Sequence, residues 1–250
     1  MFAFLSEVLS DKKGGIIFTC FSAFHIALIF AFVCLAVLAC VYVIKKGNNK
    51  KRVIDFFINL AFGLYILDFF LMPFAYGKID VEKLPFHVCT AMCVTCFLSW
   101  YNSFFAKFKL QFAMLGFLSN LIYLIYPAGV MWHAVHPLSY RVIQTLVFHG
   151  VMVIYGALVL VCESKEFDFK KCYKDLAVIF LMTAWAWFGN TLYNNQSVTY
   201  NWFFVVRDPF NMLSAEVAPY VMPALNIVVF FLAELLIYFI FSKLTKRLGR

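Results

Sequence analysis

Long apolar runs separated by short polar segments dominate the chain. A membrane-spanning helix needs about 20 mainly apolar residues. Seven stretches meet that requirement: 16–44, 53–76, 85–105, 110–132, 141–162, 175–196 and 217–242. They predict an all-α fold, a polytopic transmembrane helix bundle of about seven spans that forms a single domain over residues 1–250. Because only residues 106–109 separate the third stretch from the fourth, six spans with a re-entrant segment is the alternative.

Composition and charge support a membrane protein. Hydrophobic residues make up 64% of the chain and charged residues 14%, whereas a soluble domain is about half apolar and about a quarter charged. The net charge of +8 comes from 21 Lys and Arg residues, which gather in residues 45–52, 107–109, 163–174 and 243–250. Cytoplasmic loops carry such an excess, so the N-terminus is predicted outside and the C-terminus in the cytoplasm. No nucleic-acid partner is needed to explain the charge.

Polar side chains of the spans concentrate toward the predicted outer side. All five histidines fall in the outer half of the spans or in the outer loops. Because ionisable groups are costly inside a bilayer, this asymmetry indicates a polar cavity that opens to the non-cytoplasmic face. Its candidate substrate-binding residues are Asp68, His133, His136, Asn190 and Asn201. The alternative is that each polar group only bonds a neighbouring helix, as is common in membrane bundles.

The segment from Leu84 to Cys89 carries the most distinctive local chemistry. Pro85 suits the first position of a helix, which would place His87 in the first turn and Cys89 just past it. A helix N-terminus and a nearby histidine favour the thiolate, which is the nucleophilic form of cysteine. Residues two apart on a helix point to nearly opposite sides, so His149 or a loop histidine is the expected base for Cys89 unless the start of the span is irregular.

A metal site is not expected in this segment. Cys89, Cys93 and Cys96 share one helix face, and cysteine is a usual zinc ligand. The three thiols, however, extend over about two helical turns, which is too far for one ion. No cofactor is expected either, because the chain has no Gly-rich phosphate loop and no HExxH or GxSxG motif.

Several short motifs occur in the same order as in a known family. They are Leu84-Pro85-Phe86-His87-Val88-Cys89, Tyr126-Pro127, Phe148-His149-Gly150, Asn201-Trp202 with Arg207-Asp208-Pro209, and Ala218-Pro219-Tyr220. In these motifs the chain resembles the YwaF-like bacterial membrane proteins and their eukaryotic relative, transmembrane protein 164. The resemblance implies a membrane-embedded protein that transfers or hydrolyses acyl groups of phospholipid, and a bacterial cell membrane as its location. His87 matches the shared histidine, whereas the eukaryotic pattern places its cysteine where this chain has Phe86.

The leading hypothesis is therefore a cysteine-dependent phospholipid acyltransferase or lipid hydrolase. Cys89 would be the nucleophile and His149 or His87 the base, with phospholipid or lysophospholipid as the partner and Asn201 or Asn190 as an oxyanion donor. A non-enzymatic transporter or ligand-binding protein that uses the same cavity is the second hypothesis. A structural subunit whose polar groups only fix helix packing is the third.

Overall fold

The structure is a computed structural model that describes residues 16–76, 81–131, 134–195, 198–209 and 211–247. Over these residues it contains helices and no strand. Among the described residues, five segments are long and apolar enough to cross a membrane: Ala23–Lys45, Lys50–Leu71, Tyr140–Cys162, Phe169–Tyr193 and Ala218–Lys243. Two further apolar helices, Val88–Tyr101 and Lys109–Ile125, are shorter. The predicted helical membrane bundle is thus confirmed, while the span count of seven and the orientation stay predictions.

The chain divides into two compact units, each built from two separate stretches of sequence. One comprises residues 1–81 and 116–162, and the other comprises residues 82–115 and 163–250. We call them unit 1 and unit 2 and describe each by itself.

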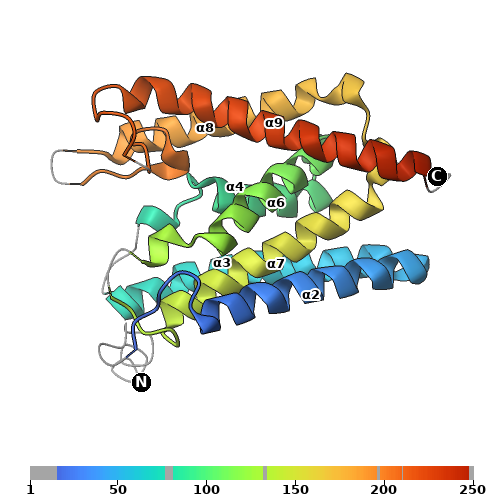
Figure 1. The fold of residues 1–250 in the computed structure, drawn as a ribbon, viewed down its shortest axis with the longest axis horizontal. Coiled ribbons are helices and arrows are strands. Elements are labelled where there is room, and N and C mark those ends of the chain that lie inside the picture. Colours follow the sequence, from blue (N-terminus) through green and yellow to red (C-terminus); the bar gives the residue numbers. More distant parts are fainter. Residues whose placement is uncertain (1–15, 77–80, 132–133, 196–197, 210, 248–250) are drawn as a thin grey trace. The chain divides into compact units, whose positions relative to one another are not determined.

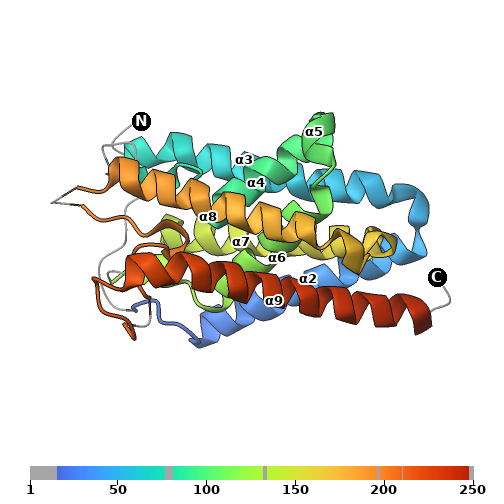
Figure 2. The ribbon, with the colours of Figure 1, turned by 90° about the horizontal axis from the view of Figure 1, so that it is seen from above.

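Unit 1 is a group of helices packed around α7. Its elements are α2 (Ala23–Lys45), η1 (Gly47–Asn49), α3 (Lys50–Tyr76), the second half of α6 (Lys109–Ile125), η3 (Ala128–Val130) and α7 (Tyr140–Cys162). Helices α2 and α7 run in the same direction and α3 runs opposite to both (Figures 1 and 2). Both α2 and α3 pack against α7. Within its most apolar window, 78% of α7 is buried, compared with 17% of α2. The apolar surface that α2 leaves exposed suits contact with lipid.

A glycine allows α2 to approach α7 closely. A Cβ atom added at Gly150 would lie 2.4 Å from the ring of Phe32. The aromatic ring therefore occupies the space that any larger residue would fill. Small residues have this function at many helix interfaces in membranes.

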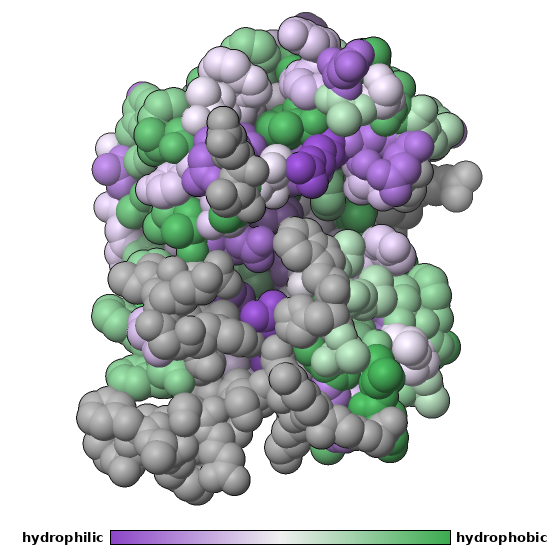
Figure 3. All heavy atoms as spheres, turned by 90° about the vertical axis from the view of Figure 1, so that its left-hand side faces the viewer, coloured by the Kyte–Doolittle hydropathy of each residue, from purple (hydrophilic) through white to green (hydrophobic). Residues whose placement is uncertain are grey.

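Unit 2 contains the remaining helices. Its elements are α4 (Val88–Tyr101), α5 (Ser103–Ala106), the first half of α6, η4 (Ser164–Glu166), η5 (Phe169–Lys171), α8 (Tyr173–Tyr193), η6 (Trp202–Phe204) and α9 (Ala218–Arg247), while η2 (Val81–Lys83) lies at the boundary between the units. Helices α8 and α9 are antiparallel neighbours, as both ribbon views show (Figures 1 and 2). Figure 3 shows that the connection from α8 to α9 presents a mixed hydrophilic and hydrophobic surface.

Several helix ends differ from the sequence prediction. The first helix begins at Ala23 and not at residue 16, because the Ser22 side chain caps it by accepting from the His25 N–H at 3.4 Å. The third stretch breaks at Asn102, whose side chain caps the short helix α5. The fourth helix ends at Ile125, just before Tyr126-Pro127, in keeping with the restriction that proline places on the residue before it.

Candidate functional site

The start of α4 holds the two residues that the sequence places at the centre of the chemistry. The helix begins at Val88, so the predicted start at Pro85 is wrong. His87 is the N-cap residue, with an extended backbone (φ −73°, ψ 136°), and Cys89 is the second helical residue. The first helical bond runs from the Ala91 N–H to the His87 carbonyl at 2.9 Å. Cys89 therefore lies inside the first turn, where the helix dipole is strongest.

The turn before α4 is held by α8, which explains why the helix does not start at the proline. The Trp185 indole N–H donates to the Pro85 carbonyl at 2.7 Å. The Phe86 ring stacks on Trp185 with a centroid distance of 4.9 Å and lies 5.0 Å from the Trp202 ring. Gly189 makes room for this ring, because an added Cβ would lie 2.4 Å from it. Phe86 thus anchors the segment that carries His87 and Cys89.

His87 and Cys89 lie in different surroundings within this arrangement. Cys89 is 3% exposed. His87 is only partly buried as a residue, and its ring meets Phe204 edge-on with 6.3 Å between centroids. The Nδ1 atom of His87 is itself buried and has no hydrogen-bond partner among the described residues. Because buried polar atoms are normally hydrogen-bonded, this nitrogen is a candidate for a role with a bound molecule.

Asn190 fixes η6 against α8. Its Oδ1 accepts from the Trp202 N–H at 3.0 Å, and its Nδ2 donates to the carbonyls of Trp202 at 3.1 Å and Ala186 at 2.8 Å. The residue is 1% exposed. Both amide hydrogens are therefore engaged within the chain. The predicted substrate role of Asn190 stays a prediction, and the structure adds a role in holding the loop.

Asn201 has a similar place in the same connection. Its Oδ1 accepts from the N–H groups of Val206 and Arg207 at 3.0 Å each, and its Nδ2 donates to the Arg207 carbonyl at 2.9 Å. These bonds close the loop that follows η6. The predicted oxyanion role of Asn201 also stays a prediction.

The backbone of η6 adopts a conformation that is uncommon for aromatic residues. Phe203 and Phe204 have positive φ angles of 55° and 52°, which bulky L residues rarely adopt. The Asn226 side chain of α9 donates to the carbonyls of both residues. Strained backbone that neighbouring bonds hold in place is often found near functional sites. Here it positions Phe204 against the His87 ring.

His149 belongs to unit 1 and has its own orienting partners. Its Nδ1 lies 2.6 Å from Asn120 Oδ1, and its ring stacks on Tyr123 at a centroid distance of 4.0 Å. The Asn120 Nδ2 donates to the Gly116 carbonyl at 2.7 Å, so the amide oxygen faces the histidine. In the neutral imidazole the proton is then on Nδ1 and Nε2 is the acceptor nitrogen. An oriented imidazole of this kind has the geometry that a base needs.

Two other polar residues of unit 1 are paired within it. Asp68 is 3% exposed and accepts from the Tyr140 hydroxyl at 3.0 Å. His25 is fully buried, its Nδ1 accepts from the Phe21 N–H at 3.0 Å, and its Nε2 lies 2.9 Å from the Leu124 carbonyl. His25 thereby ties the start of α2 to the end of α6.

Of the two loop histidines predicted to bind substrate, the structure describes His136. His136 is partly buried in the turn before α7, and its Nδ1 accepts from the Leu138 N–H at 3.2 Å. His133 lies outside the described residues.

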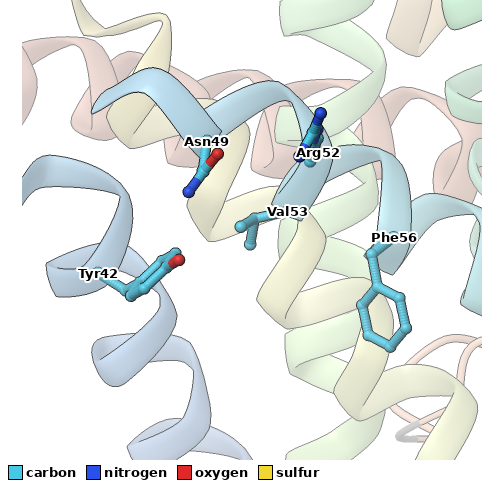
Figure 4. A pocket seen from close by; sticks show the side chains of 5 residues that line it. All are labelled: Tyr42, Asn49, Arg52, Val53 and Phe56. Atoms are coloured by element: carbon cyan, nitrogen blue, oxygen red, sulfur yellow. The ribbon is translucent and has the colours of Figure 1, made fainter. Parts of the chain in front are cut away.

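A shallow surface hollow of about 290 Å³ lies elsewhere in unit 1, between the end of α2 and the start of α3 (Figure 4). Its lining includes Tyr42 and Arg52 and none of the predicted site residues.

Comparison with known proteins identifies the family. The sequence profile of the TMEM164 family matches residues 20–245, which is nearly the whole chain. The chain belongs to the TMEM164 family. The resemblance that the motifs indicated is thus confirmed. Searches of the curated proteins and of the solved structures gave no match.

In this TMEM164 family member, the sequence prediction missed the surroundings of the α4 start. The roles of Trp185, Gly189 and Asn226 were not predicted. A signal was present for Asn226 alone, because an amide in the middle of an apolar stretch is costly without a partner. Trp185 and Gly189 look like ordinary residues of an apolar helix until Phe86 is placed against them.

Proposed function

We propose that this TMEM164 family member is a membrane-embedded, cysteine-dependent acyltransferase that acts on phospholipid, with Cys89 as nucleophile and His87 as its acid and base. The observation that carries the proposal is a buried imidazole nitrogen without a hydrogen-bond partner among the described residues, two residues from a thiol in the first turn of a helix. A thiol and a histidine at a helix N-terminus are the groups that covalent acyl transfer needs.

The local backbone is compatible with a pairing of these two side chains. Residues two apart within a helix point to nearly opposite sides. That rule does not apply here, because His87 is extended and precedes the helix. The N–H groups of Val88, Cys89 and Thr90 lie outside the i to i−4 ladder, since its first bond reaches His87 from Ala91. These dipoles favour negative charge on the Cys89 sulfur.

The reaction follows from these groups in two steps. In the first step, His87 takes the thiol proton and the Cys89 sulfur bonds to the ester carbonyl carbon of a phospholipid. The ester C–O bond then breaks, and the leaving glycerol oxygen takes the proton from His87. In the second step, the hydroxyl of a lysophospholipid gives its proton to His87 and attacks the thioester. The C–S bond breaks and the proton returns to sulfur.

The burial of the sulfur fits an intermediate that must avoid hydrolysis. Cys89 is 3% exposed, so its thioester would be kept away from bulk water. An acyl chain is compatible with the apolar helices of unit 2, since only 11% of the most apolar window of α9 is buried. If water replaces the lysophospholipid in the second step, the same chemistry is hydrolysis.

The test is acyl transfer to the protein from a phospholipid with an alkyne-tagged acyl chain, using protein reconstituted in lipid. We expect hydroxylamine-sensitive labelling of the wild type and none of Cys89→Ala. The matched control is Cys93→Ala, since Cys93 is a buried thiol one turn further along α4, and it should label like the wild type. His87→Ala should slow labelling by about 10²-fold or more, which is the usual contribution of general acid–base catalysis.

Two outcomes would count against the proposal. Labelling that persists in Cys89→Ala removes this residue as nucleophile, and an unlabelled wild type removes the activity. His149→Ala belongs in the same series, because the sequence predicts His149 as the alternative base. If His149→Ala abolishes labelling and His87→Ala does not, the role of base passes from His87 to His149.

A further inference from the structure

A second polar cluster lies in unit 2, formed by residues that the proposed reaction does not use. Asp175 is in the first turn of α8, Glu234 and Tyr238 are one turn apart on α9, and Gln111 is on α6. Asp175, Glu234 and Tyr238 are each 1% exposed, and Gln111 is 5% exposed. Both carboxyl groups lie inside segments that are apolar enough to cross a membrane. We call these four residues the carboxyl cluster.

The hydrogen bonds within the carboxyl cluster do not provide a donor for every carboxylate oxygen. The Tyr238 hydroxyl donates to Asp175 Oδ2 at 2.9 Å. The Gln111 side chain is within hydrogen-bonding reach of both Asp175 and Tyr238. Asp175 Oδ1 and both carboxylate oxygens of Glu234 are buried and have no hydrogen-bond partner among the described residues. Three acceptor oxygens without a donor are costly in an apolar interior.

The positive side chains near the carboxyl cluster are engaged elsewhere. Lys174 interacts electrostatically with Asp175, but no ion pair joins them, and the Lys174 Nζ donates to the Lys107 carbonyl at 3.5 Å. Lys109 pairs with Glu163 at 3.1 Å. In the turns η4 and η5, Lys171 pairs with Glu166 at 3.2 Å on the surface. Helix α4, which packs on α8, carries no acidic or basic side chain. No ion pair within the described residues therefore neutralises Glu234.

Tyr238 connects the two carboxyl groups, because its hydroxyl donates to Asp175 at 2.9 Å and Glu234 lies one turn before it on the same side of α9. Asp175 and Glu234 lie close enough to interact electrostatically with one another and with Tyr238. Aromatic rings close the cluster on another side, with Phe167 at 5.0 Å and Phe169 at 5.6 Å from the Tyr238 ring. Two adjacent carboxylates in such a place cannot both carry charge unless a positive charge binds with them.

We propose that Asp175 and Glu234 form a binding site for one small monovalent cation, either a proton or a sodium ion, with Gln111 and Tyr238 as neutral oxygen partners. A proton on Glu234 would let its O–H donate to Asp175 Oδ1, so that the pair shares one charge. A sodium ion would use the three remaining carboxylate oxygens, which are the hard ligands that such ions prefer. Among the described residues no third His, Cys, Asp or Glu joins them, which argues against a transition metal.

The first experiment is reaction with dicyclohexylcarbodiimide, using the full chain in liposomes and mass spectrometry to locate the adduct. This apolar reagent adds the O–H of a protonated carboxyl group across one C=N bond, giving an O-acylisourea. We expect an adduct at Glu234 that decreases about tenfold for each pH unit above the titration of the pair. At constant pH, sodium should suppress the adduct if the site binds sodium, whereas potassium should not. If sodium has no effect and pH does, the bound cation is a proton.

The second measurement removes the dependence on reagent access. The thermal unfolding temperature of the wild type in detergent should rise on lowering the pH or on adding sodium, and Glu234→Gln should lose this response. The matched control is Asp68→Asn, which removes a buried carboxyl that also accepts from a tyrosine, at 3.0 Å, but lies in unit 1. It should keep the response of the wild type.

The proposal is overturned if Glu234 gives no adduct at any pH and the unfolding temperatures of wild type and Glu234→Gln respond alike to pH and sodium. An adduct that is independent of both pH and sodium overturns it as well. The result is independent of the acyltransferase proposal, because Glu234→Gln should leave acyl labelling of Cys89 unchanged.

Discussion

At the scale of single residues, asparagine side chains take the place of regular secondary structure in the connection between α8 and α9. Backbone groups of residues 202–204, 206 and 207 form hydrogen bonds with the side chains of Asn190, Asn201 and Asn226. A buried backbone group needs a partner, and the need is greater near a bilayer, where water is scarce. These three amides therefore decide the shape of the loop that faces His87.

Asn190→Ala should destabilise the protein, because the Trp202 N–H and carbonyl lose their partners. Each unpaired buried group costs about 1–3 kcal/mol. The measurement is the thermal unfolding temperature in detergent. Thr191→Ala is the matched control, since Thr191 is exposed and its hydroxyl only donates to the Trp187 carbonyl of its own helix. Equal unfolding temperatures for the two variants would contradict the role given to Asn190.

At the scale of helices, close approach is decided by glycines that face aromatic rings. Gly150 of α7 faces Phe32 of α2, and Gly189 of α8 faces Phe86 in the turn before α4. In each case the space for a Cβ is taken by a ring on another segment. Packing of this kind positions helices in membranes, where the hydrophobic effect between them is weak.

Gly150→Ala should lower the unfolding temperature, because its Cβ would overlap the Phe32 ring and force α2 and α7 apart. Overpacking of this kind costs about 1–3 kcal/mol. Gly63→Ala in α3 is the control, since nothing lies within 4 Å of a Cβ there, and alanine favours the helix by about 1 kcal/mol. The packing argument fails if the Gly150 variant unfolds at or above the temperature of the Gly63 variant.

At the scale of the whole molecule, the two short helices α4 and α6 decide how many times the chain crosses the membrane. In the part of the chain that the structure describes, five helices are long enough to cross, whereas α4 and α6 have 14 and 17 residues. If α4 and α6 each cross, the connection between them lies on the cytoplasmic side. If they form a re-entrant segment, the chain returns to the outer side. The basic residues distinguish these two topologies. Lys107 and Lys109 follow α5, and the positive-inside rule places them on the cytoplasmic side together with the C-terminal cluster.

The single variants Lys107→Cys and Lys246→Cys, made in a background without other cysteines, should therefore react with an impermeant maleimide from the same side of sealed membranes. Both should be protected when only the outer face is exposed to the reagent. Reaction of the cysteine at 107 from the outside, with that at 246 protected, would instead favour a re-entrant segment formed by α4 and α6.

The sequence alone determined the helical membrane character and the family of the chain. Hydropathy is a local property, so apolar stretches longer than a span are visible without a fold. The segment around His87 and Cys89 was predicted correctly as the beginning of a helix, although its start is three residues later than predicted. The order of the motifs indicated the TMEM164 family, which the profile match confirms.

Only the tertiary structure decided which side chains serve as partners. Phe86 is anchored by Trp185, about a hundred residues further along, and Asn190 holds Trp202. Asp175 seemed only to begin a span, yet it accepts from Tyr238 of another helix and interacts electrostatically with Glu234 of that helix. Such pairs depend on how helices pack and on their rotation about their axes. Neither is encoded in hydropathy, because one apolar stretch is compatible with many rotations.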